Sequence, residues 1–141
     1  EHPLKGSLRH ALKSKYARTI IFSVSGVIPL KAPIIIKSGY LTIAGQSSPG
    51  GITVAGAPIK VSNTEHVIIR YMRFRLGTFK LAEDSMSIRN SSDIIIDHCS
   101  FSWSADQTLN IQNDAYDVTF SWNSITEPLA RLREGVKKFN P

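Results

Sequence analysis

An internal repeat constrains the fold of this 141-residue chain more than any other feature. Each unit has a short apolar strand, an asparagine, a second apolar strand and a third strand after a bend. Three copies align: Ile59–Val61, Asn63, Val67–Ile69 and Phe74; Met86–Ile88, Asn90, Ile94–Ile96 and Phe101; Leu109–Ile111, Asn113, Val118–Phe120 and Ile125. Asn90 follows Asn63 after 27 residues, and Asn113 follows Asn90 after 23. A period in the twenties without helical periodicity between the strands is typical of a β-solenoid.

Two other repeat or all-β folds fit less well. Leucine-rich repeats have a similar period, but their Leu-x-x-Leu-x-Leu frame is absent from this sequence. A β-sandwich favours hairpin turns, and the chain contains no Asn-Gly or Asp-Gly dipeptide. A looser early copy of the unit, formed by Ile34–Ile36, Leu41–Ile43 and Ile52–Val54, also favours the solenoid. We therefore predict an all-β parallel solenoid.

The repeated asparagines predict a ladder along one edge of the solenoid. Asn adopts the left-handed backbone region more readily than other non-glycine residues. Side chains stacked one rung apart, at about 4.8 Å, can hydrogen-bond to one another. The alternative is that Asn63, Asn90 and Asn113 are three unrelated loop residues.

The domain organisation follows from the extent of the repeat. We expect a single partial domain over residues 1–141, with a capping helix at about 6–14, rungs at about 18–126 and a charged tail at 127–141. Ser7 is the expected N-cap of the helix, which would cover the first rung. No second cap is evident after Thr126, so we expect a solenoid truncated on its C-terminal side.

Composition and charge limit the partners. Hydrophobic residues make up 42% of the chain, which suits a packed core, and no apolar run approaches the roughly 20 residues of a membrane span. The net charge of +6 favours a polyanion such as nucleic acid, an anionic membrane or an acidic polysaccharide. The basic residues do not alternate with clustered aromatics, so charge alone does not favour nucleic acid. The single cysteine, Cys99, lies in an apolar run and is expected to be buried.

Several segments together resemble the pectate lyase family of polysaccharide lyases. They are residues 6–12, 18–26, 41–46, 67–75, 94–103 and 118–123, so that the resemblance extends from about Gly6 to Thr126. It implies a right-handed parallel β-helix, secretion, and Ca²⁺-dependent cleavage of pectate (polygalacturonate) by β-elimination. It implies no nucleic acid or membrane partner and a family domain much longer than 141 residues. The sequence does not indicate an oligomeric state.

Two aspartates are candidate Ca²⁺ ligands. Asp84 precedes the strand at Met86, and Asp106, 22 residues later, precedes the equivalent strand at Leu109. Carboxylates on the same side of adjacent rungs would lie about 5 Å apart and repel each other unless a cation lies between them. Ca²⁺ accepts such oxygen ligands, and Asn110 offers a third. The alternative is that both aspartates are surface turn residues.

The resemblance assigns the same two aspartates to the metal. Asp84 and Asp106 match acidic positions of the family, whereas the family often has an aspartate at the position of Asn110. An acidic residue usually found two positions before Asp84 is replaced by Ala82, and Glu83 is the neighbouring carboxylate. We therefore expect a weaker site than the family's.

The catalytic residue is unknown. In the family the base is an arginine on a later rung, and Arg131 and Arg133 follow the third repeat at least one rung too early. Lys138 resembles a family lysine that contacts a substrate carboxylate, although a solvated basic tail explains it equally. We expect a fragment with little activity alone. The alternative is a non-catalytic β-helix module that binds acidic polysaccharide.

The remaining polar residues of the repeat have structural interpretations. Asp97 and His98 match a family signature, and we assign them to packing and hydrogen bonding. Arg70, Arg73 and Arg75 alternate with apolar residues, which predicts that they project from one strand face.

Overall fold

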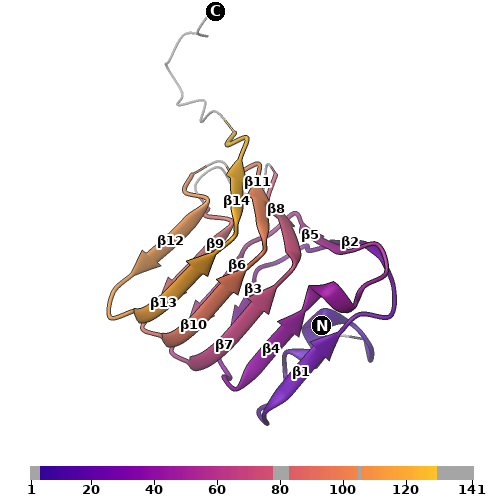
Figure 1. The fold of residues 1–141 in the computed structure, drawn as a ribbon, viewed down its shortest axis with the longest axis horizontal. Coiled ribbons are helices and arrows are strands. Elements are labelled where there is room, and N and C mark those ends of the chain that lie inside the picture. Colours follow the sequence, from indigo (N-terminus) through magenta and orange to yellow (C-terminus); the bar gives the residue numbers. More distant parts are fainter. Residues whose placement is uncertain (1–3, 78–82, 105, 130–141) are drawn as a thin grey trace, which may run out of the picture.

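The computed structural model describes residues 4–77, 83–104 and 106–129. Its strands wind into a solenoid whose three faces are parallel sheets (Figure 1). Sheet A is formed by β1 (Arg18–Ile21), β4 (Leu41–Ala44), β7 (Glu65–Arg70), β10 (Ser92–Asp97) and β13 (Tyr116–Ser121). Sheet B is formed by β2 (Gly26–Pro29), β5 (Ile52–Ala55), β8 (Met72–Arg75), β11 (Ser100–Ser102) and β14 (Ser124–Thr126). Sheet C is formed by β3 (Ile34–Ile36), β6 (Ile59–Ser62), β9 (Met86–Arg89) and β12 (Leu109–Gln112).

The strand register confirms the predicted repeat. Ile94 pairs with Val67 on one side and with Val118 on the other, at the offsets that the repeat indicated. The same agreement holds in sheet C, where Met86 pairs with Ile59 and with Leu109. The early copy is also in register, because β3, β4 and β5 occupy sheets C, A and B in the same order. The fold is the predicted parallel β-helix.

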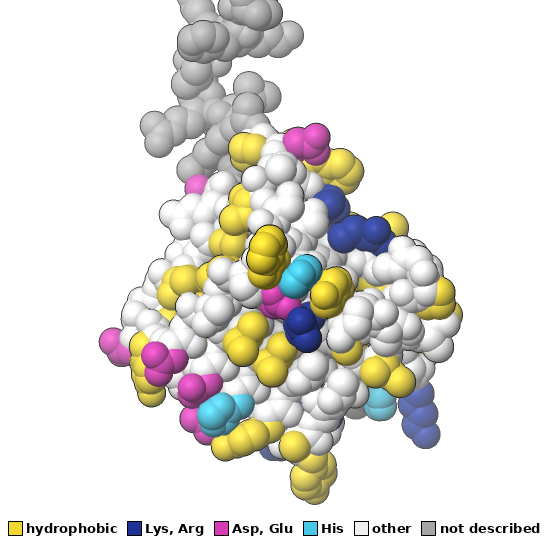
Figure 2. Space-filling view, in the orientation of Figure 1, with side chains coloured by type: hydrophobic (Ala, Val, Ile, Leu, Met, Phe, Trp, Pro, Cys, Tyr) yellow, Lys and Arg dark blue, Asp and Glu magenta, His cyan; other side chains and the backbone are white. Residues whose placement is uncertain are grey.

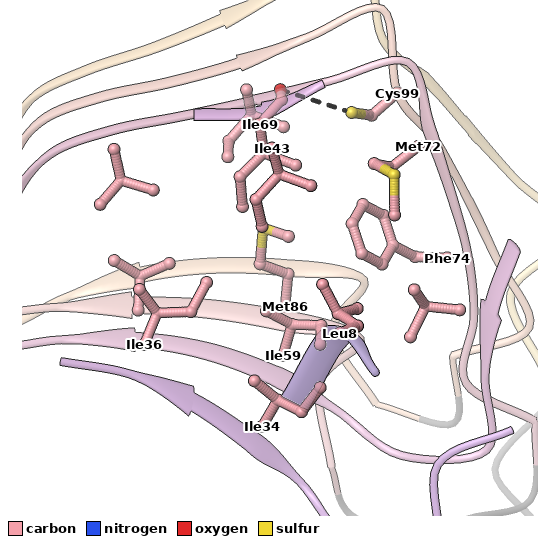
Figure 3. Close-up of a cluster of buried hydrophobic side chains, with 14 of the residues drawn as sticks. Leu8, Ile34, Ile36, Ile43, Ile59, Ile69, Met72, Phe74, Met86 and Cys99 are labelled. Atoms are coloured by element: carbon pink, nitrogen blue, oxygen red, sulfur yellow. Dashed lines mark hydrogen bonds between the residues drawn. The ribbon is translucent and has the colours of Figure 1, made fainter. Parts of the chain in front are cut away.

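The apolar triplets form the core because alternate side chains of a strand point to opposite faces. In the triplet Ile94–Ile96 the outer two residues are fully buried and Ile95 is 38% exposed. Residues that share a register position stack into columns inside the solenoid, as Figure 3 shows for Ile34 and Ile59. Phe74 and Phe101 stack in the same way, with ring centroids 4.9 Å apart and an interplanar angle of 16°.

The predicted asparagine ladder lies at the corner between sheets C and A. Asn63, Asn90 and Asn113 all adopt left-handed backbone conformations, with φ of 52°, 45° and 59°. The amide nitrogen of Asn90 donates to Oδ1 of Asn63 at 3.3 Å, so the first two members are linked by a side-chain hydrogen bond. Rung stacking therefore explains why the same residue type recurs at this corner.

The N-terminal cap is a single helical turn, shorter than expected. Helix α1 spans Leu8–Ala11, and the Ser7 hydroxyl accepts a hydrogen bond from the His10 amide, which confirms Ser7 as the N-cap. Leu8 is buried against the core, so the turn covers the first rung as predicted. A η1 turn at Gly45–Ser47 is the other helical element described. No helix among the described residues is long and apolar enough to cross a membrane.

One expectation about the arginines is wrong. Arg70, Arg73 and Arg75 do not project from one strand, because the chain bends at Tyr71, whose φ is 55°. Arg70 therefore ends β7 in sheet A, whereas Arg73 and Arg75 lie on β8 in sheet B. The alternation of apolar residues continues across the bend, which is why the pattern gave no sign of it.

Candidate functional site

The structure brings the two candidate aspartates to adjoining rungs at the corner between sheets B and C. Asp84 precedes β9 and Asp106 precedes β12. The backbone N–H of Ser85, which follows Asp84, donates to the carbonyl of Gln107, which follows Asp106, at 3.2 Å. Parallel pairing of β9 with β12 then continues this alignment into sheet C. The 22-residue spacing therefore corresponds to one rung.

The third candidate ligand contacts the first. Asn110 lies on β12, and its Nδ2 donates to Oδ2 of Asp84 at 2.8 Å across the rung boundary. Both side chains are half-buried, whereas Asp106 is exposed. An amide can present either its nitrogen or its oxygen, so a half-turn of the Asn110 amide would direct its oxygen toward the Asp84 carboxylate. Two carboxylates and one amide then supply the hard oxygen donors that Ca²⁺ prefers.

Glu83 is engaged elsewhere. Its Oε2 accepts a hydrogen bond from the Lys60 ammonium at 2.9 Å, and both side chains are about 30% exposed (31% for Lys60 and 27% for Glu83). Lys60 lies on β6 and pairs in register with Ser87, one rung below Asn110. The ion pair therefore places a positive charge beside the candidate site and leaves Glu83 poorly suited to replace the acidic residue missing at Ala82, which lies outside the described residues.

Asp97 joins three rungs. Its carboxylate accepts hydrogen bonds from Ser121 Oγ at 2.6 Å and from Arg70 Nε at 2.8 Å, and its Oδ1 lies 2.8 Å from Nδ1 of His98. These contacts, first with Ser121 and then with His98, lower the pKa of Asp97 to about 2. The carboxylate is 9% exposed, so it links sheet A internally. This arrangement agrees with the structural role assigned to Asp97 and His98.

A group of possible metal ligands that the sequence interpretation missed lies at the corner between sheets C and A. Ligand atoms of Glu65, His66 and Asp93 all lie within 4.8 Å of one another, and Nδ1 of His66 is 3.8 Å from Oδ2 of Asp93. All three residues are exposed, and exposed groups of this kind are common without an ion. Asp93 follows His66 by 27 residues, so one repeat period was the available signal.

The remaining candidates fall outside the described structure. Arg131, Arg133 and Lys138 belong to residues 130–141. The Lys138 assignment and most of the charged tail therefore stay predictions.

Comparison with known proteins relates the chain to pectate lyases. It is 40% identical over 127 residues to a protein of Aspergillus flavus named "Probable pectate lyase C" and 38% identical over 127 residues to one of the same name from Emericella nidulans. Each alignment covers 89% of this chain and 30% of the fungal protein. The chain thus spans about a third of the length of these relatives. No protein-family model matches it.

Proposed function

We propose that this chain, as a relative of the pectate lyases, forms the first rungs and part of the Ca²⁺ site of a secreted protein that cleaves polygalacturonate by β-elimination. In this proposal Asp84, Asp106 and Asn110 hold the ion. The observation that supports it most directly is the contact between Asp84 and Asn110 across adjoining rungs. It links two candidate ligands that are 26 positions apart in the sequence.

The chemistry requires stabilisation of negative charge. Removal of the proton next to a galacturonate carboxylate leaves charge on that carbon and on the carboxylate, and a bound Ca²⁺ would supply the compensating positive charge. The contribution of this chain is to hold the ligands in place. Parallel pairing of β9 with β12 fixes their backbones, and the Asn110 amide has to turn to present its oxygen.

The neighbouring ion pair would help to define the site. Lys60 neutralises Glu83, so the charge next to the ion comes from Asp84 and Asp106. Two carboxylates and a neutral amide give fewer charged ligands than a site with an aspartate at position 110. Affinity for Ca²⁺ falls with ligand charge, so binding is expected to be weak.

The base is expected to lie outside these rungs. An arginine is normally protonated, so it acts as a base only in a specific setting, and no arginine of the described residues lies in the position that the family resemblance requires. The purified chain is therefore expected to give little or no unsaturated product from polygalacturonate. Ca²⁺-dependent product absorbance from this chain alone would contradict the fragment interpretation.

Calorimetric titration of Ca²⁺ tests the site directly. Asp84→Asn and Asp106→Asn each remove one ligand charge with little change of shape, and saturable binding should be lost or greatly weakened in both. Asp93→Asn is the matched control, because Asp93 is also exposed and belongs to the other possible ligand group. Absence of Ca²⁺ binding by the unmodified chain, or a loss confined to Asp93→Asn, would refute the assignment.

A further inference from the structure

Three side chains form an exposed stack at the corner between sheets A and B. Tyr71, His98 and Trp122 occupy equivalent bends on successive rungs, with φ of 55°, 51° and 52°. The Tyr71 and His98 rings are 4.7 Å apart and inclined by 19°, and the His98 and Trp122 rings are 6.1 Å apart and inclined by 25°. Figure 2 shows this region as a histidine between hydrophobic side chains near the centre of the visible face.

Core packing does not account for this stack. Trp122 is 84% exposed and Tyr71 is 40% exposed, although both are large and apolar. Exposed aromatic side chains that gather in one place usually mark a binding surface, because their rings offer apolar area and a polar atom at once. The left-handed bend turns each of these side chains outward instead of into the core.

An arginine without an acidic partner lies beside the stack. Arg73 projects from β8, is exposed, and donates from Nε to Oγ1 of Thr53 at 3.1 Å and from Nη2 to the carbonyl of Gly50 at 2.9 Å. Both partners are neutral. Among the ion pairs of the described residues, Arg70 takes part but Arg73 does not. Its charge therefore remains available to an anion.

The local backbone leaves room for this guanidinium. A Cβ at Gly51 would lie 2.5 Å from Nη2 of Arg73, so the absence of a side chain there lets the arginine lie across the sheet. Arg73, Tyr71 and His98 line a shallow groove of about 240 Å³ together with polar residues, among them Gln46, Ser48 and Ser100. The groove thus combines a positive charge, hydroxyl and amide groups, and aromatic edges.

We propose that the aromatic–arginine patch, formed by Tyr71, Arg73, His98, Ser100 and Trp122, binds a uronic-acid polysaccharide. A guanidinium pairs well with the carboxylate of a uronate, and hydroxyl and amide groups match the sugar hydroxyls. The apolar face of a pyranose ring packs against the exposed Trp122 ring. The choice of polymer rests on the proposed function, but the patch lies at a different corner of the solenoid from Asp84 and Asp106. It is a second contact that needs no Ca²⁺.

Binding of polygalacturonate in EDTA tests this patch separately from the metal site. The purified chain is titrated with polygalacturonate, and its variants Arg73→Ala and Trp122→Ala are compared with charge- and exposure-matched controls. Lys31→Ala removes an exposed charge elsewhere, and Tyr16→Ala removes an aromatic side chain that is 83% exposed near the N-terminus. Circular dichroism and urea midpoints verify that each variant folds.

We expect both patch variants to weaken binding by about fivefold or more and both controls to change it by less than about twofold. Asp84→Asn should bind as tightly as the unmodified chain in EDTA. Equal losses in Arg73→Ala and Lys31→Ala would show a general charge effect and overturn the proposal. Absence of binding in EDTA, or equal binding of a neutral polysaccharide, would overturn it as well. None of these outcomes depends on whether Ca²⁺ binds at Asp84.

Discussion

The substitution Asn110→Asp examines the metal proposal in the opposite direction, by adding a ligand charge. Nδ2 of Asn110 lies 2.8 Å from Oδ2 of Asp84, so the new carboxylate would lie beside an existing one and lose its hydrogen bond. Two unit charges about 4 Å apart near a protein surface repel by roughly 4 kcal/mol. Partial exposure of both groups reduces this value, and we expect the unfolding free energy to fall by about 1–3 kcal/mol without Ca²⁺.

A cation between the carboxylates would reverse this cost. If Ca²⁺ binds there, relief of about 1–3 kcal/mol tightens its binding by about 5- to 150-fold and restores stability. Urea unfolding with and without Ca²⁺ and calorimetric titration measure both quantities. Asn113→Asp is the matched control, because it adds the same charge at an exposed bend on the same rung. Equal destabilisation of Asn110→Asp with and without Ca²⁺, or equal tightening in Asn113→Asp, would refute the reasoning.

Three further predictions concern stability and reactivity. Phe101→Ala removes a ring with 0% exposure and should lower the unfolding free energy by about 3–5 kcal/mol in urea, whereas Ile125→Ala, in register but 55% exposed, should cost less than about 1.5 kcal/mol; similar costs would contradict the burial. The pKa of Asp97 is lowered to about 2, so its carboxylate stabilises the fold above about pH 4, and this contribution should be lost as the pH falls toward 2; an unchanged acid profile in Asp97→Asn would argue against it. Burial raises the pKa of the Cys99 thiol to about 11, so a thiol reagent at pH 8 should react only after denaturant is added, and rapid labelling of the folded chain would disprove this.

The solenoid could be predicted because its inward positions repeat. Ile59, Met86 and Leu109 occupy one column, and their spacing in the sequence is the spacing of the strands in sheet C. Packing against the rung above and the rung below keeps each of these positions apolar. The same logic brought Asp84 and Asp106 to adjoining rungs, since both flank strands of that column.

The bends could not be predicted in the same way. Tyr71 and Trp122 have positive φ, which bulky residues adopt only where surrounding structure imposes it. The local sequence therefore continues the alternating pattern of a strand, and the run from Val67 to Arg75 gives no sign of its division into two sheets. Pairing with the neighbouring rungs decides where the chain turns, and that information is not local.

This division between inward and outward positions explains where chemistry can arise in the solenoid. A residue that points outward is freed from core packing, yet it stands one strand spacing, about 4.8 Å, from its equivalents on the next rungs. Groups repeated at that spacing form lines parallel to the solenoid axis, as the Tyr71, His98 and Trp122 stack does. Such a line suits an extended polymer better than a compact ligand. Because this line and the aspartate pair occupy different corners, an acidic polysaccharide can contact the first while only the second requires a metal ion.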